Sequence, residues 1–214
     1  MANRYLMAVD AGTGSVRAVL FNEDGAQLSC VQREWTHAED PRYPGSMDFD
    51  WVHNWELASA CIRGAIAEAG VDAADIAAVS TTCMREGIVL YDKDGQEIWA
   101  CANVDARSDD EVAQLVHMNP ELEKQIYRES GQTYALGALP RLFWVKNKMP
   151  EVYEKTAVCT MFNDWLIYKM TGVFSSEPSN ACTTGIFDLK ARDWDDKIAA
   201  SIGLKTGIFP KISE

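Results

Sequence analysis

Short stretches of alternating apolar and polar residues open the chain and predict strands. Residues 5–9 form an apolar run, which ends at an aspartate and a Gly-Thr-Gly-Ser turn. Residues 15–21 place every second apolar side chain on one face, which is the period of a strand. Residues 26–35 follow a second turn and can form a third strand. We therefore expect an antiparallel meander at the start of the chain.

Beyond residue 50 the apolar spacing alternates between that of helices and that of strands. Asp50 can cap a helix whose apolar residues recur up to Gly70, a stop signal. Residues 76–82 follow as a mostly apolar strand, which we expect to be parallel and buried. The remaining pattern predicts a hairpin over 87–100, helices over 108–118, 120–129, 140–148, 162–170 and 194–202, and strands over 157–161 and 185–189. This order is typical of one α/β domain.

The composition is that of an ordinary globular protein, and the net charge limits the kinds of partner that the protein can bind. The 214 residues are 47% hydrophobic and 24% charged, and the net charge is −12. Such acidity argues against an open nucleic-acid surface, because phosphates need Lys and Arg. It does not exclude nucleotide binding, since a local site can be positive.

Cysteine usage and the N-terminal residues bear on metal binding and location. The six cysteines form no CxxC pair, and with three scattered histidines they show no zinc spacing, so we expect buried, reduced thiols. The chain enters a strand-like run without the apolar segment of a signal peptide. No apolar run approaches the roughly 20 residues of a membrane span. We expect a cytoplasmic protein with no membrane or nucleic-acid partner.

The glycine-rich turn suggests a grip on phosphate, although it matches neither common motif. A P-loop needs a Lys and a Rossmann fingerprint needs a third glycine, and both lead into a helix, whereas a strand follows here. Backbone N–H groups of a tight turn can form an anion-binding concavity. Gly12 and Gly14 would let a phosphate approach the backbone, and Thr13 and Ser15 would add hydroxyl donors.

Two charged residues flank this turn. Asp10 could hold hydrated Mg²⁺ near the phosphates, and Arg17 could offset charge on a phosphoryl group in transfer. From the turn alone, an ordinary hairpin with a solvated aspartate and arginine is an equal alternative.

Further motifs, in the right order, accompany this turn. The pattern Asp-x-Gly-Thr-x-Ser-x-Arg-Ala resembles the first phosphate loop of the actin, Hsp70 and sugar kinase superfamily, and more specifically that of the FGGY carbohydrate kinases. Other stretches resemble segments of the same family: PGSMDFD, IAAVSTTCMREGIVLYDKDGQEI, VDAR, NDWLIYKMTG and PSNACTTGIFDLKARDWDD. Together they extend from Tyr5 to the end of the chain.

The resemblance implies an RNase-H-like α/β fold with a mixed sheet flanked by helices. It also implies an enzyme of two such domains, with ATP and a small sugar-like substrate between them. The family's catalytic aspartate and adenosine site belong to the second domain, and neither motif follows Leu204 here. We therefore expect residues 1–214 to be a single N-terminal domain, inactive alone, which needs an ATP-binding C-terminal domain that this chain lacks.

The resemblance also points to residues that would bind the substrate. Arg85 and Glu86 stand at the sugar in the family, and an adjacent donor fork and acceptor suit the hydroxyls of a polyol. The alternative is a surface ion pair of under about 1 kcal/mol. Asp105 and Arg107 match the family's Asp-x-Arg and could reach the substrate or orient Arg85, although a structural role at a helix start is nearly as plausible.

Three other matching residues are expected to be architectural rather than in contact with substrate, namely Asp164, Ser179 and Asn180. Asn103 and Leu136 depart from residues that xylulokinases and glycerol kinases carry, which argues against both of those substrates.

Within the family, CMREGIVLY, IWACANVDAR, YRESGQT and PSNACTTG are most similar to the autoinducer-2 kinase subgroup. That subgroup phosphorylates a primary hydroxyl of an open-chain dihydroxy-dione, the autoinducer-2 precursor, with ATP and Mg²⁺. A kinase for xylulose, ribulose or glycerol, a stand-alone sugar-binding module and an actin-like interaction domain remain alternatives.

Overall fold

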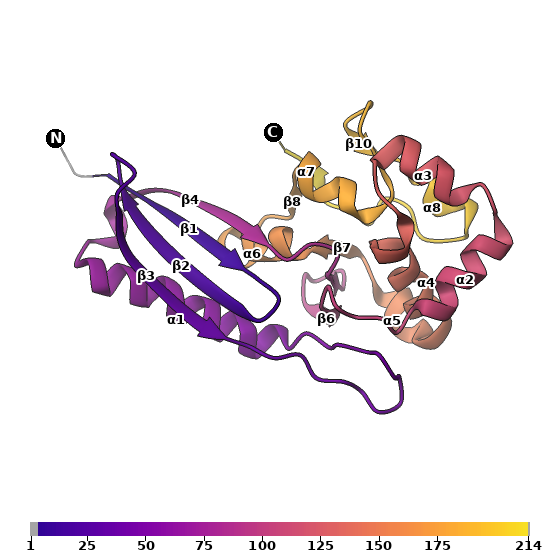
Figure 1. Cartoon of the computed structure of the whole chain (residues 1–214), viewed down its shortest axis with the longest axis horizontal. Coiled ribbons are helices and arrows are strands. Elements are labelled where there is room, and N and C mark those ends of the chain that lie inside the picture. Colours follow the sequence, from indigo (N-terminus) through magenta and orange to yellow (C-terminus); the bar gives the residue numbers. More distant parts are fainter. Residues whose placement is uncertain (1–3, 214) are drawn as a thin grey trace. The chain divides into compact units, whose positions relative to one another are not determined.

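The computed structural model describes residues 4–213, and for Leu136 the backbone alone, so the substrate-selecting side chain expected there lies outside the described part. The chain folds into two compact units, which are described in turn (Figure 1). The first unit comprises residues 4–37 and 50–84, and the second comprises residues 38–49 and 85–213.

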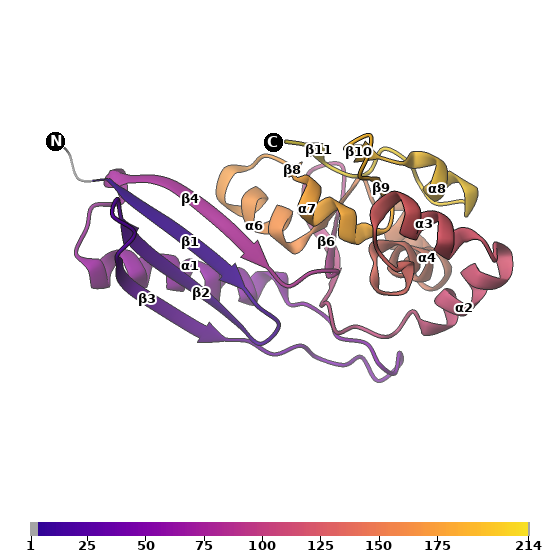
Figure 2. The same ribbon diagram turned by 45° about the horizontal axis from the view of Figure 1, so that its top comes forward.

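A mixed four-stranded sheet forms the first unit. Its strands are β1 (Tyr5–Ala11), β2 (Ser15–Asn22), β3 (Gln27–Glu34) and β4 (Ile76–Cys83), in the order β3-β2-β1-β4 (Figure 2). The first three pair antiparallel, which confirms the predicted meander, and β4 pairs parallel to β1. Helix α1 (Trp51–Ala69) runs along this sheet (Figure 1).

The core of this unit follows from the alternation in β2. Val16, Ala18 and Leu20 are fully buried, as the period of two predicts. Helix α1 packs closely on the sheet at Gly64, where a Cβ would be 3.2 Å from a Val31 methyl group. The predicted helix ends are confirmed, because the Asp50 carboxylate accepts from the His53 N–H and Gly70 closes the helix at φ 65°.

The expected burial of the strand after α1 is wrong. β4 is parallel to β1 as predicted, but most of its residues are exposed or only half-buried. The reason is its place in the sheet: it has one neighbour, β1, and α1 packs chiefly on β2 and β3. The pattern of an apolar strand after a helix therefore predicted the parallel pairing correctly, but it wrongly predicted that other elements cover this strand.

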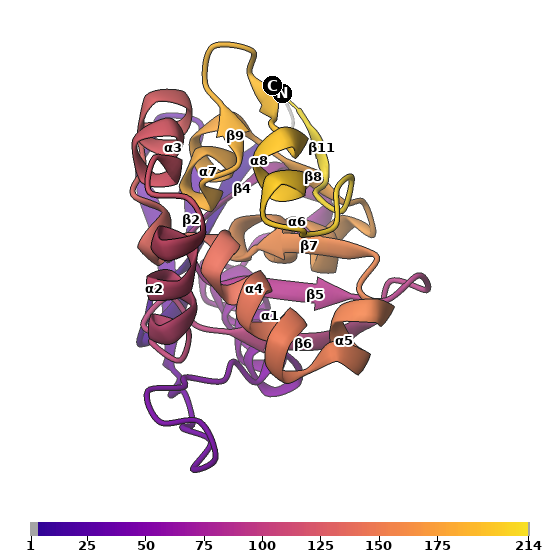
Figure 3. The same cartoon turned by 90° about the vertical axis from the view of Figure 1, so that its right-hand side faces the viewer.

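An antiparallel three-stranded sheet lies in the second unit. It is ordered β6-β5-β7, from β5 (Ile88–Tyr91), β6 (Glu97–Cys101) and β7 (Val158–Met161) (Figure 3). All four residues of β5 are buried, because the strand is central in the sheet. The same unit contains the helices α2 (Asp109–Met118), α3 (Leu122–Ser130), α4 (Ala138–Lys148), α5 (Pro150–Lys155) and α6 (Phe162–Thr171). The apolar face of α4 shares one hydrophobic core with β5.

Short elements complete the second unit. They are η2 (Tyr134–Leu136), β8 (Ser175–Ser176), α7 (Pro178–Ala181), η3 (Cys182–Thr184), β9 (Phe187–Asp188), β10 (Asp193–Trp194), α8 (Asp196–Ser201) and β11 (Lys211–Ile212), and η1 (Ala73–Asp75) is their counterpart in the first unit. β8 pairs parallel to β11, and β9 pairs antiparallel to β10. Periodicity did not predict α5, α7, β8 or β11, because each is too short to show a period.

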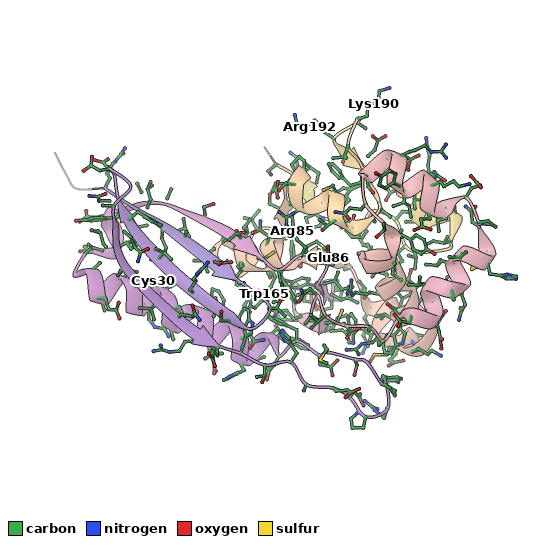
Figure 4. All side chains as sticks on the ribbon, in the orientation of Figure 1. Cys30, Arg85, Glu86, Trp165, Lys190 and Arg192 are labelled. Atoms are coloured by element: carbon green, nitrogen blue, oxygen red, sulfur yellow. The ribbon has the colours of Figure 1, made fainter. Side chains whose placement is uncertain are left out.

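Two further expectations concern membranes and thiols. Across residues 4–213, no helix combines the length and apolar character needed to cross a bilayer. Three of the free cysteines are buried, two are half-buried, and Cys30 on β3 is exposed (Figure 4). The expectation of buried thiols is therefore wrong for Cys30, whose side chain lies on the face of β3 opposite to the buried Val31.

Candidate functional site

The glycine turn joins β1 to β2 in the first unit, with its two charged residues opposite each other. Asp10 and Arg17 are direct partners in the antiparallel register. Arg17 donates to Oδ2 of Asp10 from Nε at 2.9 Å and from Nη2 at 2.7 Å. Both side chains remain partly exposed. The predicted pair is thus brought together as an ion pair at the base of the turn.

Side chains after β3 hold the carbonyl groups of the turn. The Trp35 indole donates to the carbonyls of Gly12 and Thr13 at 3.0 and 3.1 Å, and the Trp35 N–H donates to that of Gly14. The His37 ring also lies 2.8 Å from the Thr13 carbonyl, and burial lowers the pKa of this imidazole. Because N–H and C=O of a trans peptide point in opposite directions, these contacts turn the amides of residues 13–15 away from Trp35 and His37.

The two glycines of the turn are not required by the local backbone. Neither adopts the left-handed region, and a Cβ on Gly14 would meet nothing within 4 Å. A Cβ on Gly12 would make an ordinary contact of 3.5 Å with the Ser15 carbonyl. The space above the turn is therefore open in the described structure.

Arg85 and Glu86 begin the second unit, directly after β4 (Figure 4). Glu86 has φ 68°, a left-handed conformation that side chains with a Cβ seldom adopt. The neighbouring Gly87 is tightly packed, since a Cβ there would lie 2.2 Å from the Phe162 ring. Next to this tightly packed glycine, Glu86 thus has a strained conformation of the kind that clusters at functional sites.

The Arg85 side chain is exposed but anchored at its tip. Its Nη1 donates to the carbonyl of Ser179 in α7. The Cys182 thiol lies against the same carbonyl at 3.3 Å, and burial raises the pKa of that thiol while Arg85 opposes the shift. One guanidinium nitrogen is thereby fixed, and the remaining donors can serve a ligand.

Glu86 is half-buried, and its charge is supported by two arginines. Burial raises the pKa of the Glu86 carboxyl, and the positive charges of Arg141 and then Arg85 oppose that rise. Arg141 is 2% exposed on α4 and donates to the carbonyls of Gly137, Asn103 and Asp105. A carboxylate whose charge is favoured by two nearby arginines is well suited to accept hydrogen bonds from hydroxyls.

Sequence reasoning missed Arg141. The helix over 140–148 was predicted, but a charged residue in it was not singled out. The available signal was its phase: Arg141 lies three residues after Ala138 and four before Val145, both fully buried, and so on the apolar face of α4. A charged residue at such a position is seldom buried without partners.

Asp105 and Arg107 form a buried ion pair. Arg107 donates from Nε to Asp105 Oδ2 at 2.7 Å and also binds Asp48. Asp105 also accepts a hydrogen bond from the Met47 N–H. The guanidinium carbon of Arg107 lies 5.2 and 5.1 Å from the ring centroids of Trp99 and Trp144. Within residues 4–213, no hydrogen bond or ion pair joins either residue to Arg85 or Glu86. This arrangement ties Asp105 and Arg107 to the 45–48 loop.

Asp164, the third residue of α6, is a buried carboxyl. It accepts from the Met161 N–H at 3.1 Å and from the Asn180 side-chain amide at 2.9 Å. Burial raises the pKa of Asp164 to about 7, although these hydrogen bonds oppose the shift. No group of three or more His, Cys, Asp or Glu side chains among the described residues could hold a metal, so this carboxyl is not part of such a cluster.

We expect Asp164 to make stability fall as pH rises. Its pKa is raised in the folded state, so between about pH 4 and pH 7 the native protein binds more protons than the unfolded chain. The loss over this window is at most about 4 kcal/mol, at 1.36 kcal/mol per pKa unit. Urea unfolding of wild type and Asp164→Asn at pH 5 and pH 8 measures this loss. The free energy of unfolding of wild type should fall relative to that of Asp164→Asn between the two pH values. An equal difference at pH 5 and pH 8 would show that Asp164 does not titrate in this window.

Comparison with known proteins shows which family the chain resembles. Residues 5–214 match the N-terminal domain of the FGGY family of carbohydrate kinases. Curated relatives include an autoinducer-2 kinase of Salmonella typhimurium, 47% identical over 214 residues, and one of Klebsiella pneumoniae, 49% identical over 211 residues. These matches cover 100% and 98% of this chain but only 40% of each relative.

Solved structures of sugar kinases share the fold. A gluconate kinase from Lactobacillus acidophilus matches with a TM-score of 0.88 and 22% identity, over 99% of this chain and 42% of that one. A glycerol kinase from Plasmodium falciparum, solved with ADP, matches with a TM-score of 0.85 and 19% identity, over 98% and 43%. These likenesses confirm the α/β fold with a mixed sheet that the motifs predicted. The chain belongs to the FGGY family of carbohydrate kinases and matches its N-terminal domain.

Proposed function

We propose that this chain is the acceptor-binding, N-terminal part of an ATP-dependent carbohydrate kinase. The kinase transfers the γ-phosphoryl group of ATP to a primary hydroxyl of a small sugar-like acceptor. The observation that carries the proposal is the strained, half-buried Glu86 beside the anchored Arg85, in a chain of this family. Because ATP is a cytoplasmic substrate, we place the reaction in the cytoplasm.

Arg85 and Glu86 bind the acceptor in this proposal. The free donors of Arg85 bind acceptor oxygens, and the Glu86 carboxylate accepts from its hydroxyls. Holding the acceptor at a fixed orientation lowers the entropic part of the barrier, which supplies much of the catalysis in phosphoryl transfer. The aspartate that takes the hydroxyl proton and most of the nucleotide site would belong to a C-terminal domain outside these residues, so residues 1–214 alone would be inactive.

The β1–β2 turn holds the phosphates of ATP in this proposal. Its amides turn away from Trp35 and His37, and no atom lies within 4 Å of a Cβ built on Gly14, which leaves room for an anion there. Mg²⁺, when bound, neutralises phosphate charge. Asp10 fits that ion because Arg17 engages Oδ2 and leaves Oδ1 for a hydrated metal. Arg17 would orient Asp10 rather than contact the transferred group directly.

The acceptor we propose is the open-chain form of the autoinducer-2 precursor. Support comes from the relatives named autoinducer-2 kinase, which are 47–49% identical to this chain. The test is ADP release by the full-length kinase with that precursor, xylulose, ribulose, glycerol or no acceptor. We expect strong turnover with the precursor alone. Preferred turnover of a pentulose or glycerol would refute the proposed acceptor but agree with the proposed kinase activity. A lack of any acceptor-dependent turnover would refute both proposals.

Gly14→Ala tests the phosphate turn separately from folding. A methyl group there meets no atom of the protein, so the free energy of unfolding should change by less than about 0.5 kcal/mol. The same methyl group would hinder a phosphate on the amides, and losing one charge-assisted hydrogen bond raises the KM for ATP by about tenfold or more. Steady-state kinetics and thermal unfolding of the full-length kinase measure both quantities. An unchanged KM for ATP would refute the turn as a phosphate site.

A further inference from the structure

The first turn of α6 lies next to Gly87, which directly follows the two residues of the proposed acceptor site. A Cβ on Gly87 would lie 2.2 Å from the ring of Phe162, the first residue of α6. Asp164, two residues later, is 1% exposed and has no part in the function proposed above. Its carboxylate links α6 to α7 through the Asn180 amide, which donates to Oδ1 at 2.9 Å.

Hydrogen bonds continue from Asn180 to Arg85. Ser179 precedes Asn180 in α7, and its carbonyl is the group that accepts from Arg85 Nη1. The N–H and hydroxyl of Ser179 both donate to the Glu177 carboxylate at 2.7 Å. Glu177 thus holds the N–H and the hydroxyl of Ser179. The contact between Asn180 and Asp164 holds the residue that follows the Ser179 carbonyl.

One buried polar atom beside Asp164 lacks a hydrogen bond. Within residues 4–213, Asn180 Oδ1 has no partner, whereas the Ser176 hydroxyl lies near the Asp164 carboxylate and favours its ionised form. Buried polar atoms of this kind are uncommon and call for an explanation. After rotation of its amide, Asn180 could accept a hydrogen bond through Oδ1 from a neutral Asp164. The cluster can therefore accommodate two hydrogen-bond patterns, of which the observed one suits the ionised carboxylate.

We propose that Asp164 is a positioning residue for Arg85: through Asn180 it fixes the Ser179 carbonyl that holds the guanidinium. This inference rests on the proposed role of Arg85 in binding the acceptor. When Asp164 is ionised, the Asn180 N–H is held and α7 is fixed. When Asp164 is neutral, that hydrogen bond weakens and Arg85 loses a fixed anchor.

The surroundings of Asp164 place its titration in an accessible pH range. Burial raises its pKa to about 7, the Met161 and Asn180 hydrogen bonds and the nearby Ser176 hydroxyl oppose the rise, and the Glu177 charge adds to it. The Cys159 thiol of β7 and the Tyr91 hydroxyl of β5 are the other ionisable groups near it, and burial raises the pKa of both. Both are therefore neutral near pH 7, so Asp164 is the group that changes charge there.

The experiment measures KM for acceptor, KM for ATP and kcat of the full-length kinase from pH 6 to pH 8.5. In wild type, the KM for acceptor should fall by about fivefold as pH rises through 7, the effect of one hydrogen bond. In Asp164→Asn, which stays neutral, that KM should remain high at all pH values. Asn180→Ala removes the link but keeps the carboxyl, and it should also give a high, flat KM. The KM for ATP should stay unchanged in both variants.

Each outcome decides the inference. Variants that keep the wild-type KM for acceptor and its pH dependence would overturn it. A change in kcat and both KM values together would show a merely structural role and also overturn it. Arg85→Ala separates this inference from the proposed function: if that variant keeps the wild-type KM for acceptor, the proposed site itself fails. Glu123→Gln, exposed on α3, is the matched control, and Asn180→Ala keeps the test intact should Asp164→Asn not fold.

Discussion

Replacing Glu86 with glycine is expected to stabilise the protein and to abolish efficient acceptor phosphorylation. Glu86 has φ 68°, and glycine adopts this conformation without the cost of about 1–2 kcal/mol that a Cβ carries there. Burial also disfavours the ionised carboxylate more than Arg141 and Arg85 favour it, so its removal adds to the gain. A gain of about 1 kcal/mol raises the Tm by roughly 2–4 °C in a chain of this size.

The same substitution removes both carboxylate oxygens that would accept from acceptor hydroxyls. Hydrogen bonds to a charged group contribute about 1.5–3 kcal/mol each, so kcat/KM for acceptor should fall by at least about 100-fold. Thermal unfolding and steady-state kinetics of the full-length kinase measure the two effects on one variant. Glu86→Gln keeps the strained backbone and should lose activity while gaining less stability than Glu86→Gly. A less stable and fully active Glu86→Gly protein would contradict both expectations.

Gly137→Ala is expected to destabilise the protein far more than a glycine-to-alanine change usually does. Gly137 precedes α4, and a Cβ on it would lie 2.6 Å from the backbone carbonyl oxygen of Thr184. Backbone cannot move aside as a flexible side chain can, so we expect a loss of about 3 kcal/mol, at the upper end for overpacking. The Tm should fall by roughly 6–12 °C.

Gly14→Ala is the matched control for this substitution, because its Cβ meets open space. Gly137 also offers its carbonyl to Arg141 at 3.2 Å, so the substitution should disturb the support of Glu86 as well. Urea unfolding of both variants gives the comparison. Equal free energies of unfolding for Gly137→Ala and Gly14→Ala would show that α4 and η3 are not packed as described.

Local patterns were sufficient to predict most of the fold. The alternation in β2, the Asp50 cap and the Gly70 stop are local features, and the structure has each where predicted. The glycine turn and the Arg-Glu pair were identified from their order along the chain and their resemblance to a family.

Tertiary packing determined what the sequence could not show. β4 is exposed because its covering layer is decided by where α1 lies, not by its own residues. The support of Glu86 by Arg141 joins positions 55 residues apart, and no local pattern relates them. The close packing of Gly87 depends on the Phe162 ring, and the pKa of Asp164 depends on its burial. Pairwise contacts at such separations are invisible to periodicity.

A crystal structure of the full-length kinase with its acceptor bound tests the role of Arg85 and Glu86 most directly. We expect acceptor hydroxyls about 2.5–3.0 Å from the Glu86 carboxylate oxygens and acceptor oxygens about 2.7–3.2 Å from Arg85 nitrogens, the ranges of ordinary hydrogen bonds. We also expect Arg85 to keep its contact with the Ser179 carbonyl in that complex. An acceptor bound without contact to Arg85 or Glu86 would contradict the proposed site.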